Sequence, residues 1–387
     1  MAGGVHLIRK KVVALFAVFM LVAGVGVTVL PTSAQAAPPD PEPSLGGSWS
    51  CESSGECQYL DSSNNPYKST WLLWNNKWYY FGFDGWMYRT VGEYTYANES
   101  LISGGYYRFD SSGAMVTGWV YTKWTVDGKY YWMYYGSDGR NVWKKASYIN
   151  GAWYVFNGKG FMVADATYVT GDGKEYRLTA SGKAYTGWYQ DGSDWYYYGS
   201  DGAMYKEQWL YSGGQWYYFD SVGKMYANMA VEIGGSYYRF TSSGAMLTGW
   251  YQDGSDWYYY GSDGAMYQGR WLYYGGQWYA FGYIGIMWSG ICLSGFGEDS
   301  NNIYCYDNSG AMAANGWFLN PAEGTWSYLS PSGAAYPGWQ YIGGKWYYFK
   351  SPGCDMVTGT YKIGNVNYVF DSSGAWTGKS YATGKAL

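Results

Sequence analysis

The sequence is nearly without histidine and is poor in charge. His6 is the only histidine among 387 residues, and charged residues make up 14% of the chain. If His6 is removed with the N-terminal segment described below, no imidazole remains, so a serine–histidine nucleophilic triad cannot be built and most zinc sites lose a customary ligand. The sequence has no Lys/Arg tract that would follow a nucleic-acid backbone or an anionic lipid surface. We therefore expect no catalysis, no cofactor, no metal and no nucleic-acid partner.

Long apolar runs are also scarce, apart from one near the N-terminus. A basic segment, residues 9–11, precedes an uncharged apolar run, residues 12–30, and an Ala-Gln-Ala cleavage pattern follows at residues 34–36. This pattern predicts a signal peptide over residues 1–36; a retained membrane anchor is the alternative, because the run could just span a bilayer. Cleavage would remove three basic residues and the histidine, leaving 22 basic against 29 acidic residues, a charge of −7. A Pro-rich spacer, residues 37–47, comes next.

Cysteine is rare, with five residues in the chain. Cys51 and Cys57 flank a short Ser/Gly turn, and Cys292 and Cys305 flank a longer Gly/Asp/Asn loop. Because export permits disulfides, we predict that each pair staples one hairpin. Cys354 is left over, and we expect an exposed or partly buried thiol in a turn, with pairing to another chain as the alternative.

Glycine and aromatic residues dominate what is present. The chain has 58 Gly, 49 Tyr and 24 Trp, and the twenty residues 186–205 recur unchanged at residues 248–267. Looser copies of the same text cover residues 48–376, in about fifteen units of roughly twenty residues, and residues 377–387 form a tail. Every third unit lacks the first tryptophan of the pattern. Such a period predicts an array of one supersecondary unit instead of a single core.

The unit itself is predicted to be a β-hairpin. Two aromatic runs flank Gly213 and Gly214, a two-residue turn signal. With this turn, Trp209 faces Tyr218 across the two strands. A single hairpin is marginal in water, so the aromatic faces should be covered by neighbouring hairpins. The predicted fold class is therefore all-β, a solenoid of about fifteen stacked hairpins.

The repeated text, Gly-Trp, a turn, Trp-Tyr-Tyr-Phe, a Gly turn and Met, resembles a known repeat. It is similar to the cell-wall-binding, or choline-binding, repeat of Gram-positive surface proteins and phage lysins. It also resembles the glucan-binding repeats of extracellular glucosyltransferases. The resemblance implies ligand sites between consecutive hairpins, where aromatic side chains from two neighbours, often with a Met, form a box around choline. A quaternary ammonium has no donor hydrogens and is recognised by aromatic faces.

Carried over residue by residue, the resemblance marks candidate ligand-binding residues in the best-matching units. The first-strand tryptophans are Trp188, Trp209, Trp250, Trp271 and Trp339. The second-strand tryptophans are Trp195, Trp216, Trp257, Trp278 and Trp346. The rings lent by an adjacent hairpin are expected to be Tyr217, Tyr258, Tyr279 and Tyr347, and the methionines that close boxes are expected to be Met204, Met225, Met266 and Met287. The alternative is that these side chains form only the core of the stack.

Three functions fit these features. The first is a secreted, non-catalytic protein that binds choline groups of teichoic acids at many sites at once. The second is a glucan or glycan binder, because flat Trp and Tyr faces also stack on sugar rings. The third is a structural or adhesive surface protein that binds a host or partner protein. In each case we expect a secreted or cell-surface location, with no membrane span once the signal is cleaved.

Overall fold

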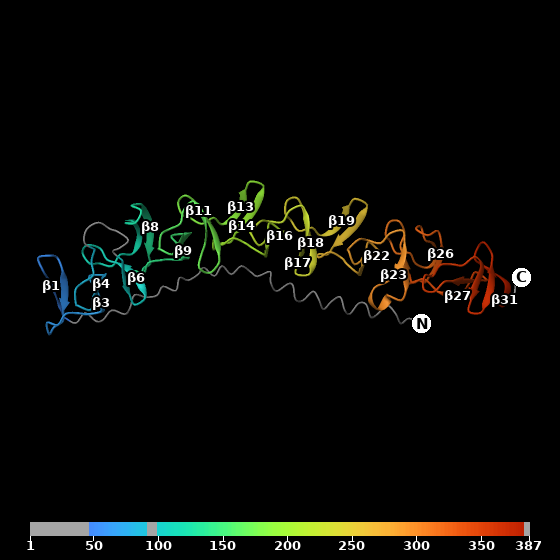
Figure 1. Ribbon diagram of the computed structural model, residues 1–387, viewed down its shortest axis with the longest axis horizontal. Coiled ribbons are helices and arrows are strands. Elements are labelled where there is room, and N and C mark those ends of the chain that lie inside the picture. The colour runs from blue at the N-terminus through green and yellow to red at the C-terminus, as the bar shows by residue number, and fades with distance from the viewer. Residues whose placement is uncertain (1–45, 91–98, 383–387) are drawn as a thin grey trace. The chain divides into compact units, whose positions relative to one another are not determined.

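The computed structural model describes residues 46–90 and 99–382. The predicted signal peptide, most of the predicted spacer and the last residues of the predicted tail lie outside the described residues, so these boundaries stay predictions. Within the described part, no helix is long and apolar enough to cross a membrane. The regular structure there is almost entirely antiparallel β-strand, drawn as arrows in Figure 1.

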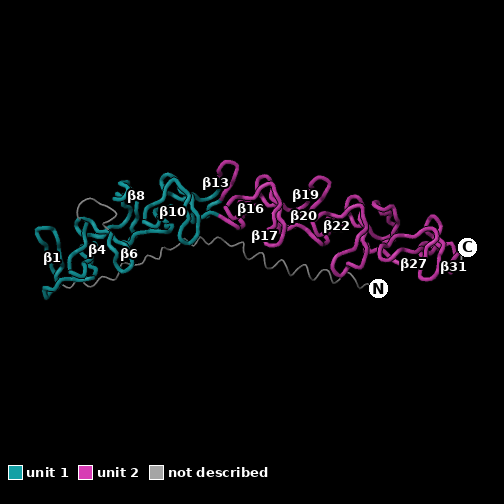
Figure 2. Tube along the Cα trace, viewed as in Figure 1, with its two compact units in different colours: residues 1–189, 197–204 teal, residues 190–196, 205–387 magenta. Residues whose placement is uncertain are grey.

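The chain divides into two compact units, coloured separately in Figure 2. Unit 1 comprises residues 1–189 and 197–204, and unit 2 comprises residues 190–196 and 205–387. The strands of unit 1 are β1 (Ser48–Cys51), β2 (Cys57–Leu60), β3 (Thr70–Trp74), β4 (Lys77–Phe81), β5 (Glu99–Ile102), β6 (Gly105–Arg108), β7 (Gly118–Lys123), β8 (Tyr130–Tyr135), β9 (Lys145–Ile149), β10 (Ala152–Phe156), β11 (Ala166–Val169) and β12 (Glu175–Leu178). Strands that contain residues of both units are β13 (Gly187–Asp191) and β14 (Asp194–Tyr198).

Unit 2 continues the same series of strands and has one short 3-10 turn, η3 (Gly297–Asp299). Its strands are β15 (Gln208–Ser212), β16 (Gln215–Phe219), β17 (Met229–Ile233), β18 (Ser236–Phe240), β19 (Gly249–Asp253), β20 (Asp256–Tyr260), β21 (Arg270–Tyr274), β22 (Gln277–Phe281), β23 (Cys292–Ser294), β24 (Ile303–Cys305), β25 (Gly316–Leu319), β26 (Trp326–Leu329), β27 (Gly338–Ile342), β28 (Lys345–Phe349), β29 (Gly359–Ile363), β30 (Val366–Phe370) and β31 (Trp376–Ala382).

Consecutive strands form fifteen separate sheets, fourteen of two strands and one of three, β29–β30–β31. This confirms the predicted all-β array of about fifteen hairpins over the described residues. The predicted register is confirmed too, because Trp209 pairs with Tyr218 and Tyr211 with Trp216. Strand β31 pairs with β30 and extends to Ala382, so sheet structure continues past residue 376, where the sequence had placed the end of the repeats.

The turns explain why these sequences close as hairpins. Gly213 and Gly214 join β15 to β16 with φ of 58° and 80°. Positive φ at both central residues is the requirement of the type I′ turn, whose twist matches the strands that it joins. At β3–β4 the same positions are Asn75 and Asn76, with φ of 50° and 59°. Glycine and asparagine tolerate this left-handed conformation better than other residues.

In most hairpins the core is the aromatic residue that ends the second strand. Phe81, Phe219, Phe281 and Phe349 are completely buried, and in β20 Tyr260 takes this place at 2% exposure. The buried residues of the described part form separate clusters of three or four side chains rather than one large core. This arrangement suits a chain with abundant aromatic residues and little Leu or Ile.

A backbone hydrogen bond ties each hairpin to the one before it. Met246 pairs with Phe240 of its own hairpin, and its amide donates to the carbonyl of Trp216, 2.7 Å away, in the preceding hairpin. In the same way, the amide of Met287 donates to the carbonyl of Trp257 over 2.8 Å. Each hairpin is thus joined to its neighbour in the chain, which is the nearest-neighbour principle of a solenoid.

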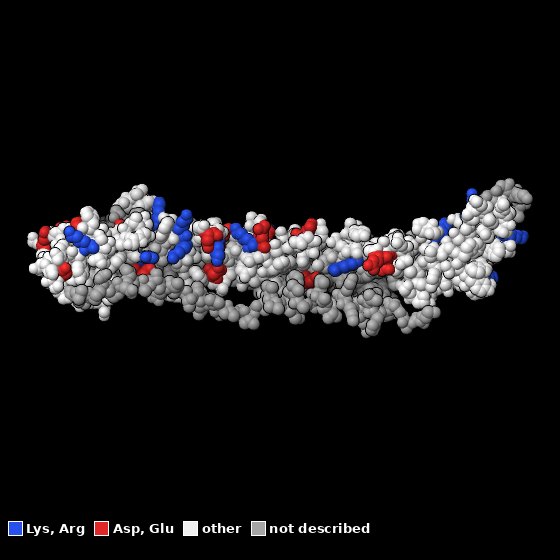
Figure 3. Space-filling model, turned by 90° about the horizontal axis from the view of Figure 1, so that it is seen from below, with Lys and Arg blue, Asp and Glu red and all other residues white. Residues whose placement is uncertain are grey.

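Charge is sparse and mixed. On the face drawn in Figure 3, acidic and basic side chains are interspersed among uncharged residues. Two ion pairs link neighbouring repeats: Lys174 lies 2.9 Å from Asp201 in unit 1, and Lys224 lies 2.7 Å from Asp194 in unit 2. The surface drawn there offers no single-sign field that would steer a nucleic acid.

Candidate aromatic boxes

Three aromatic rings meet at the end of hairpin β15–β16. Trp209 lies perpendicular to Trp216, with ring centres 6.3 Å apart and an interplanar angle of 89°. Tyr238, from the next hairpin, lies 4.9 Å from Trp209 at 67°. Trp216 is 41% exposed, while Trp209 is partly buried. The three rings therefore form the walls of a box that is open to solvent.

The register of the hairpin produces this geometry. Trp209 and Trp216 lie on neighbouring strands, two positions apart in the ladder, and their side chains point to the same face. Trp209 also packs on Phe240 at 5.9 Å, so the first-strand tryptophan is anchored against the core of the following hairpin. The solvent-accessible surface of the box thus belongs chiefly to the second-strand tryptophan.

The same box recurs along both units. In each case the two tryptophans of one hairpin are 6.1–6.4 Å apart and nearly perpendicular, and a tyrosine of the next hairpin lies 4.9–5.1 Å from the first tryptophan. The sets are Trp71, Trp78 and Tyr107; Trp119, Trp132 and Tyr154; Trp250, Trp257 and Tyr279; Trp317, Trp326 and Tyr347; and Trp339, Trp346 and Tyr368.

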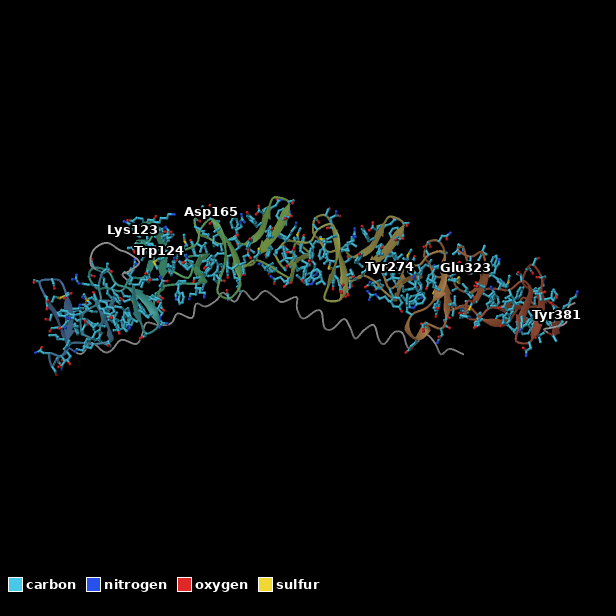
Figure 4. All side chains as sticks on the ribbon, viewed as in Figure 1. Lys123, Trp124, Asp165, Tyr274, Glu323 and Tyr381 are labelled. Carbon is cyan, nitrogen blue, oxygen red and sulfur yellow. A yellow bond between two sulfur atoms is a disulfide. The ribbon has the colours of Figure 1, made fainter. Side chains whose placement is uncertain are left out.

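Two of these boxes gain a fourth ring. Trp376, the first residue of β31, lies 6.0 Å from Trp339 and 6.1 Å from Tyr368. Tyr274, at the end of β21 and labelled in Figure 4, lies 5.8 Å from Trp250 at 80° and is 50% exposed. A fourth ring enlarges the aromatic surface of these two boxes.

Some predicted residues are therefore brought together as expected. Tyr279 and Tyr347 lie against a tryptophan of the preceding hairpin, as the resemblance implied for a lent ring. Tyr258 follows a hairpin without a first-strand tryptophan and lies 6.4 Å from Tyr251 of its own hairpin. Tyr217 pairs with Leu210 across its own hairpin and is partly buried.

The remaining predicted tryptophans are placed less uniformly. Trp188 packs on Tyr197 at 5.3 Å, and Trp195 is 37% exposed. Trp271 packs on Tyr304 of the next hairpin at 4.8 Å, whereas Trp278 packs on Tyr273 at 5.1 Å. The ligand-binding role of all of these residues stays a prediction.

The predicted methionines fall into two pairs. Met225 and Met287 are buried, and Met287 belongs to the cluster against which Trp250 and Tyr279 pack. The hydrogen bond from the Met287 amide to the carbonyl of Trp257 places this methionine beside a box.

The backbone amides of Met204 and Met266 instead donate hydrogen bonds to the carbonyls of Glu175 and Tyr237, which lie in hairpins without a first-strand tryptophan. The methionine tied to Trp216 is Met246, which the sequence reasoning did not select. The structure thus shows that a box and its methionine belong to consecutive repeats, an offset that the repeat text does not display.

Sequence reasoning also missed several rings of the boxes. Trp71 and Trp78 have the same seven-residue spacing as the selected pairs and could have been found. Longer turns separate Trp119 from Trp132 and Trp317 from Trp326, which hid them from a fixed spacing. The box role of Trp376 has no repeat signal, because it depends on the third strand of the last sheet.

Every third hairpin lacks this arrangement because both members of one cross-strand pair change. In hairpin β15–β16 this pair is Trp209 with Tyr218. In the hairpins that lack the arrangement, the corresponding pairs contain no tryptophan. They are Glu99 with Arg108, Thr167 with Arg177, Ala230 with Arg239, Cys292 with Cys305, and Thr360 with Val369. One further hairpin, β9–β10, has Ala146 paired with Val155.

Both predicted disulfides are present in the structure. Cys51 bonds to Cys57, and Cys292 bonds to Cys305, each between directly paired strand positions. Cys354 is buried beside Cys305 and Leu329, more deeply than the predicted thiol in a turn. Burial raises the pKa of the Cys354 thiol to about 11, so the thiol is protonated at neutral pH.

A separate cavity of about 480 Å³ lies in unit 1 beside the long turn of β7–β8. Trp124, labelled in Figure 4, lines it with Tyr131 and Phe161, and the last two rings are stacked 4.4 Å apart. The ammonium of Lys159 lies 3.5 Å from the centre of the Trp124 ring. The protein therefore places its own cation on this aromatic surface.

The carboxylates mostly serve turns. Asp220 accepts hydrogen bonds from the amides of Val222 and Lys224, and Asp201 accepts one from Ala203. These are the side-chain-to-backbone bonds that Asp makes in tight turns. Among the described residues, no three His, Cys, Asp or Glu side chains gather as metal ligands would.

The described residues thus form an array of hairpins, several of which carry an aromatic box. Residues 186–204, 207–225, 248–266 and 338–353 match the family described as "Putative cell wall binding repeat". These four segments are therefore similar to cell wall binding repeats, as the resemblance in the sequence indicated.

Solved structures from Streptococcus pneumoniae are similar to this chain. The structure of CbpJ is 27% identical, with a TM-score of 0.31, and the match covers 80% of this chain and 99% of CbpJ. The choline-binding domain of CbpL is 29% identical, with a TM-score of 0.39, over 50% of this chain and 97% of the domain. Choline binding protein F is 25% identical, with a TM-score of 0.31, and the match covers 79% of this chain and 98% of that protein. No curated protein matches the chain.

Proposed function

We propose that this protein is a secreted, non-catalytic cell-envelope-binding protein whose aromatic boxes hold choline groups of teichoic acids. The observation that carries the proposal is the three-ring box, with two perpendicular tryptophans of one hairpin and a tyrosine of the next. A quaternary ammonium held against the exposed faces of such rings would gain about 0.5–2 kcal/mol per ring.

Multiplicity supports the proposal. A single open box would bind weakly, but an array of boxes on one chain can engage several side groups of one polymer. The effective concentration of the second group then strengthens attachment without any new contact. A repeated polymer such as a teichoic acid fits a repeated protein for this reason.

The experiment is a titration of intrinsic tryptophan fluorescence with choline chloride, using sodium chloride at matched ionic strength as the control. We expect a saturable change with choline alone, because the ligand would lie against tryptophan rings. Trp250→Ala should reduce the change. Trp153→Ala removes a tryptophan from β9–β10, which lacks a box, and should leave the affinity unchanged. An identical response to both salts would refute the proposal.

A second candidate, glycan binding, is favoured by a different observation. Tyr211 and Trp216 form a tilted cross-strand pair 5.1 Å apart, and both are exposed. The pairs Tyr273 with Trp278 and Tyr341 with Trp346 repeat it at 5.1 and 5.2 Å. A saturable response to dextran that is lost in Tyr211→Ala, without a response to choline, would select this function. Silence to both ligands would favour the adhesive or structural role.

A further inference from the structure

Three arginines lie where every third hairpin lacks its tryptophan. Arg239 pairs with Ala230, Arg177 with Thr167 and Arg108 with Glu99. In the regular hairpin β15–β16, these two ladder positions hold Tyr218 and Trp209. The small residue opposite Arg239 and Arg177 leaves room that a tryptophan would otherwise fill.

Arg239 uses this room to reach tyrosines of the next hairpin. Its guanidinium carbon lies 3.7 Å from the centre of the Tyr251 ring. The Tyr258 and Tyr260 rings lie 6.4 Å from Tyr251, and the Tyr260 ring is inclined at 71° to it. Burial raises the pKa of Tyr260 and of Tyr258, and the nearby Arg239 charge opposes both rises.

Unit 1 repeats the arrangement independently. The guanidinium carbon of Arg177 lies 4.4 Å from the Tyr189 ring, and Tyr198 lies 6.1 Å from Tyr189 at 74°. These rings come from the copy of the twenty-residue text at residues 186–205, which is identical to the copy that supplies the rings around Arg239. Arg108 lies 5.8 Å from the Tyr135 ring in a third instance.

We propose that these tyrosine groups are cation sites that the protein fills with its own arginines. We call the group of Tyr251, Tyr258 and Tyr260 the tyrosine cage. A guanidinium is planar and weakly hydrated, so it stacks on aromatic faces as a quaternary ammonium does. The arginine therefore stabilises the junction between hairpins and excludes an external cation from it.

One consequence rests on the proposed function and the other does not. If the boxes bind choline, the external sites come in runs that an arginine-filled junction interrupts. The filled cage itself, however, requires only that the tyrosines accept a cation. Removal of the guanidinium should open a site for a small guanidinium or quaternary ammonium ion at that junction.

The test uses R239A in the full exported chain. We expect its thermal midpoint to rise saturably with millimolar methylguanidinium chloride, relative to sodium chloride at equal ionic strength, because the ion refills the cage. The wild type should respond less than R239A, because its own guanidinium already fills the cage. The matched control is R270A, because Arg270 also lies 3.5 Å from a tyrosine ring, Tyr267, but is exposed and sits beside a first-strand tryptophan, Trp271.

Other outcomes are equally informative. An R239A midpoint that responds to methylguanidinium no more than the wild type and R270A would overturn the proposal. If R239A does not fold, R177A provides the same test in unit 1, and failure of either variant to be rescued when folded counts against a cage. Equilibrium dialysis against choline, which counts the choline bound per chain, separates the two hypotheses. If methylguanidinium stabilises R239A but the protein binds no choline, the cage is retained and the proposed function is rejected. If R239A binds one choline more per chain than the wild type, both are supported.

Discussion

Hairpins β15–β16 and β17–β18 are neighbours with the same backbone and different faces. Both turn at a Gly-Gly pair with positive φ, and both end in a buried phenylalanine, Phe219 or Phe240. Only the first has the perpendicular tryptophan pair. The second has Ala230 and Arg239 in its ladder instead. The fold therefore depends on the turn and the terminal aromatic ring, and the tryptophans are free to serve another purpose.

The largest effect should come from the shared core. We expect Phe219→Ala and Phe240→Ala each to lower the free energy of unfolding by about 3–5 kcal/mol, because both leave a cavity at a fully buried ring. Denaturant unfolding followed by circular dichroism measures the loss. Tyr211→Ala, at a 59% exposed ring, should change stability by about 0.5 kcal/mol or less. If the two variants lost different amounts of unfolding free energy, the two hairpins would not share the same kind of core.

The next effect concerns the hairpin β23–β24, where a disulfide occupies the tryptophan position. Replacing Cys292 and Cys305 by alanine should lower stability by about 3 kcal/mol, and replacing Cys51 and Cys57 by about 2 kcal/mol, because loop-closure entropy grows with the enclosed length. The sequence separations are 13 and 6 residues. Thermal unfolding of the two double variants should show this order, and the reverse order would contradict the entropic explanation.

The comparison is sharpened by ligand affinity. Trp209→Ala should weaken choline binding at its box by about 2- to 30-fold, corresponding to the loss of one ring at about 0.5–2 kcal/mol. Ala230→Gly, at the equivalent position of the neighbouring hairpin, should leave choline binding unchanged. Isothermal calorimetry on both variants makes the distinction. Equal effects would mean that the tryptophan contributes to folding and not to a site.

A chemical probe tests the buried thiol. Because burial raises the pKa of Cys354 to about 11, alkylation by iodoacetamide at pH 8 should be slow in the folded protein and fast in urea. The raised pKa means that folding is favoured while the thiol is protonated. This contribution is complete below the ordinary thiol pKa and is lost as pH rises towards 11. Rapid alkylation of the folded chain would show that the thiol is accessible.

The smallest effect should come from the ion pair between neighbouring hairpins. The hydrogen bond from Lys224 lowers the pKa of Asp194 below its ordinary value. Its contribution to stability is therefore present above that ordinary value and is lost as pH falls through the acid range. Lys224→Gln should move the Asp194 pKa upward in an NMR titration, with Lys159→Gln as a control. An unchanged Asp194 titration would show that the pair is not formed in solution.

Much of the fold could be predicted because the unit is local. Gly213 and Gly214 select the turn, the turn sets the register of Trp209 with Tyr218, and this pairing is confirmed. The disulfides followed from the same hairpin logic. The site was harder to predict, since spacing found Trp209 with Trp216 but missed Trp317 with Trp326, where a longer turn intervenes.

The sequence by itself determined the hairpin, its register, its number of copies and the tryptophan pair of those boxes whose strands are joined by a two-residue turn. These features depend on contacts over about twenty residues, which the repeat text contains. The tertiary structure decided which neighbour supplies the third ring, which methionine lies beside a box, and that Trp376 joins Trp339 and Tyr368. It also placed Arg239 over Tyr251. Such contacts join different repeats. Because the repeats are nearly identical, the residues of one repeat do not reveal which other repeat it contacts.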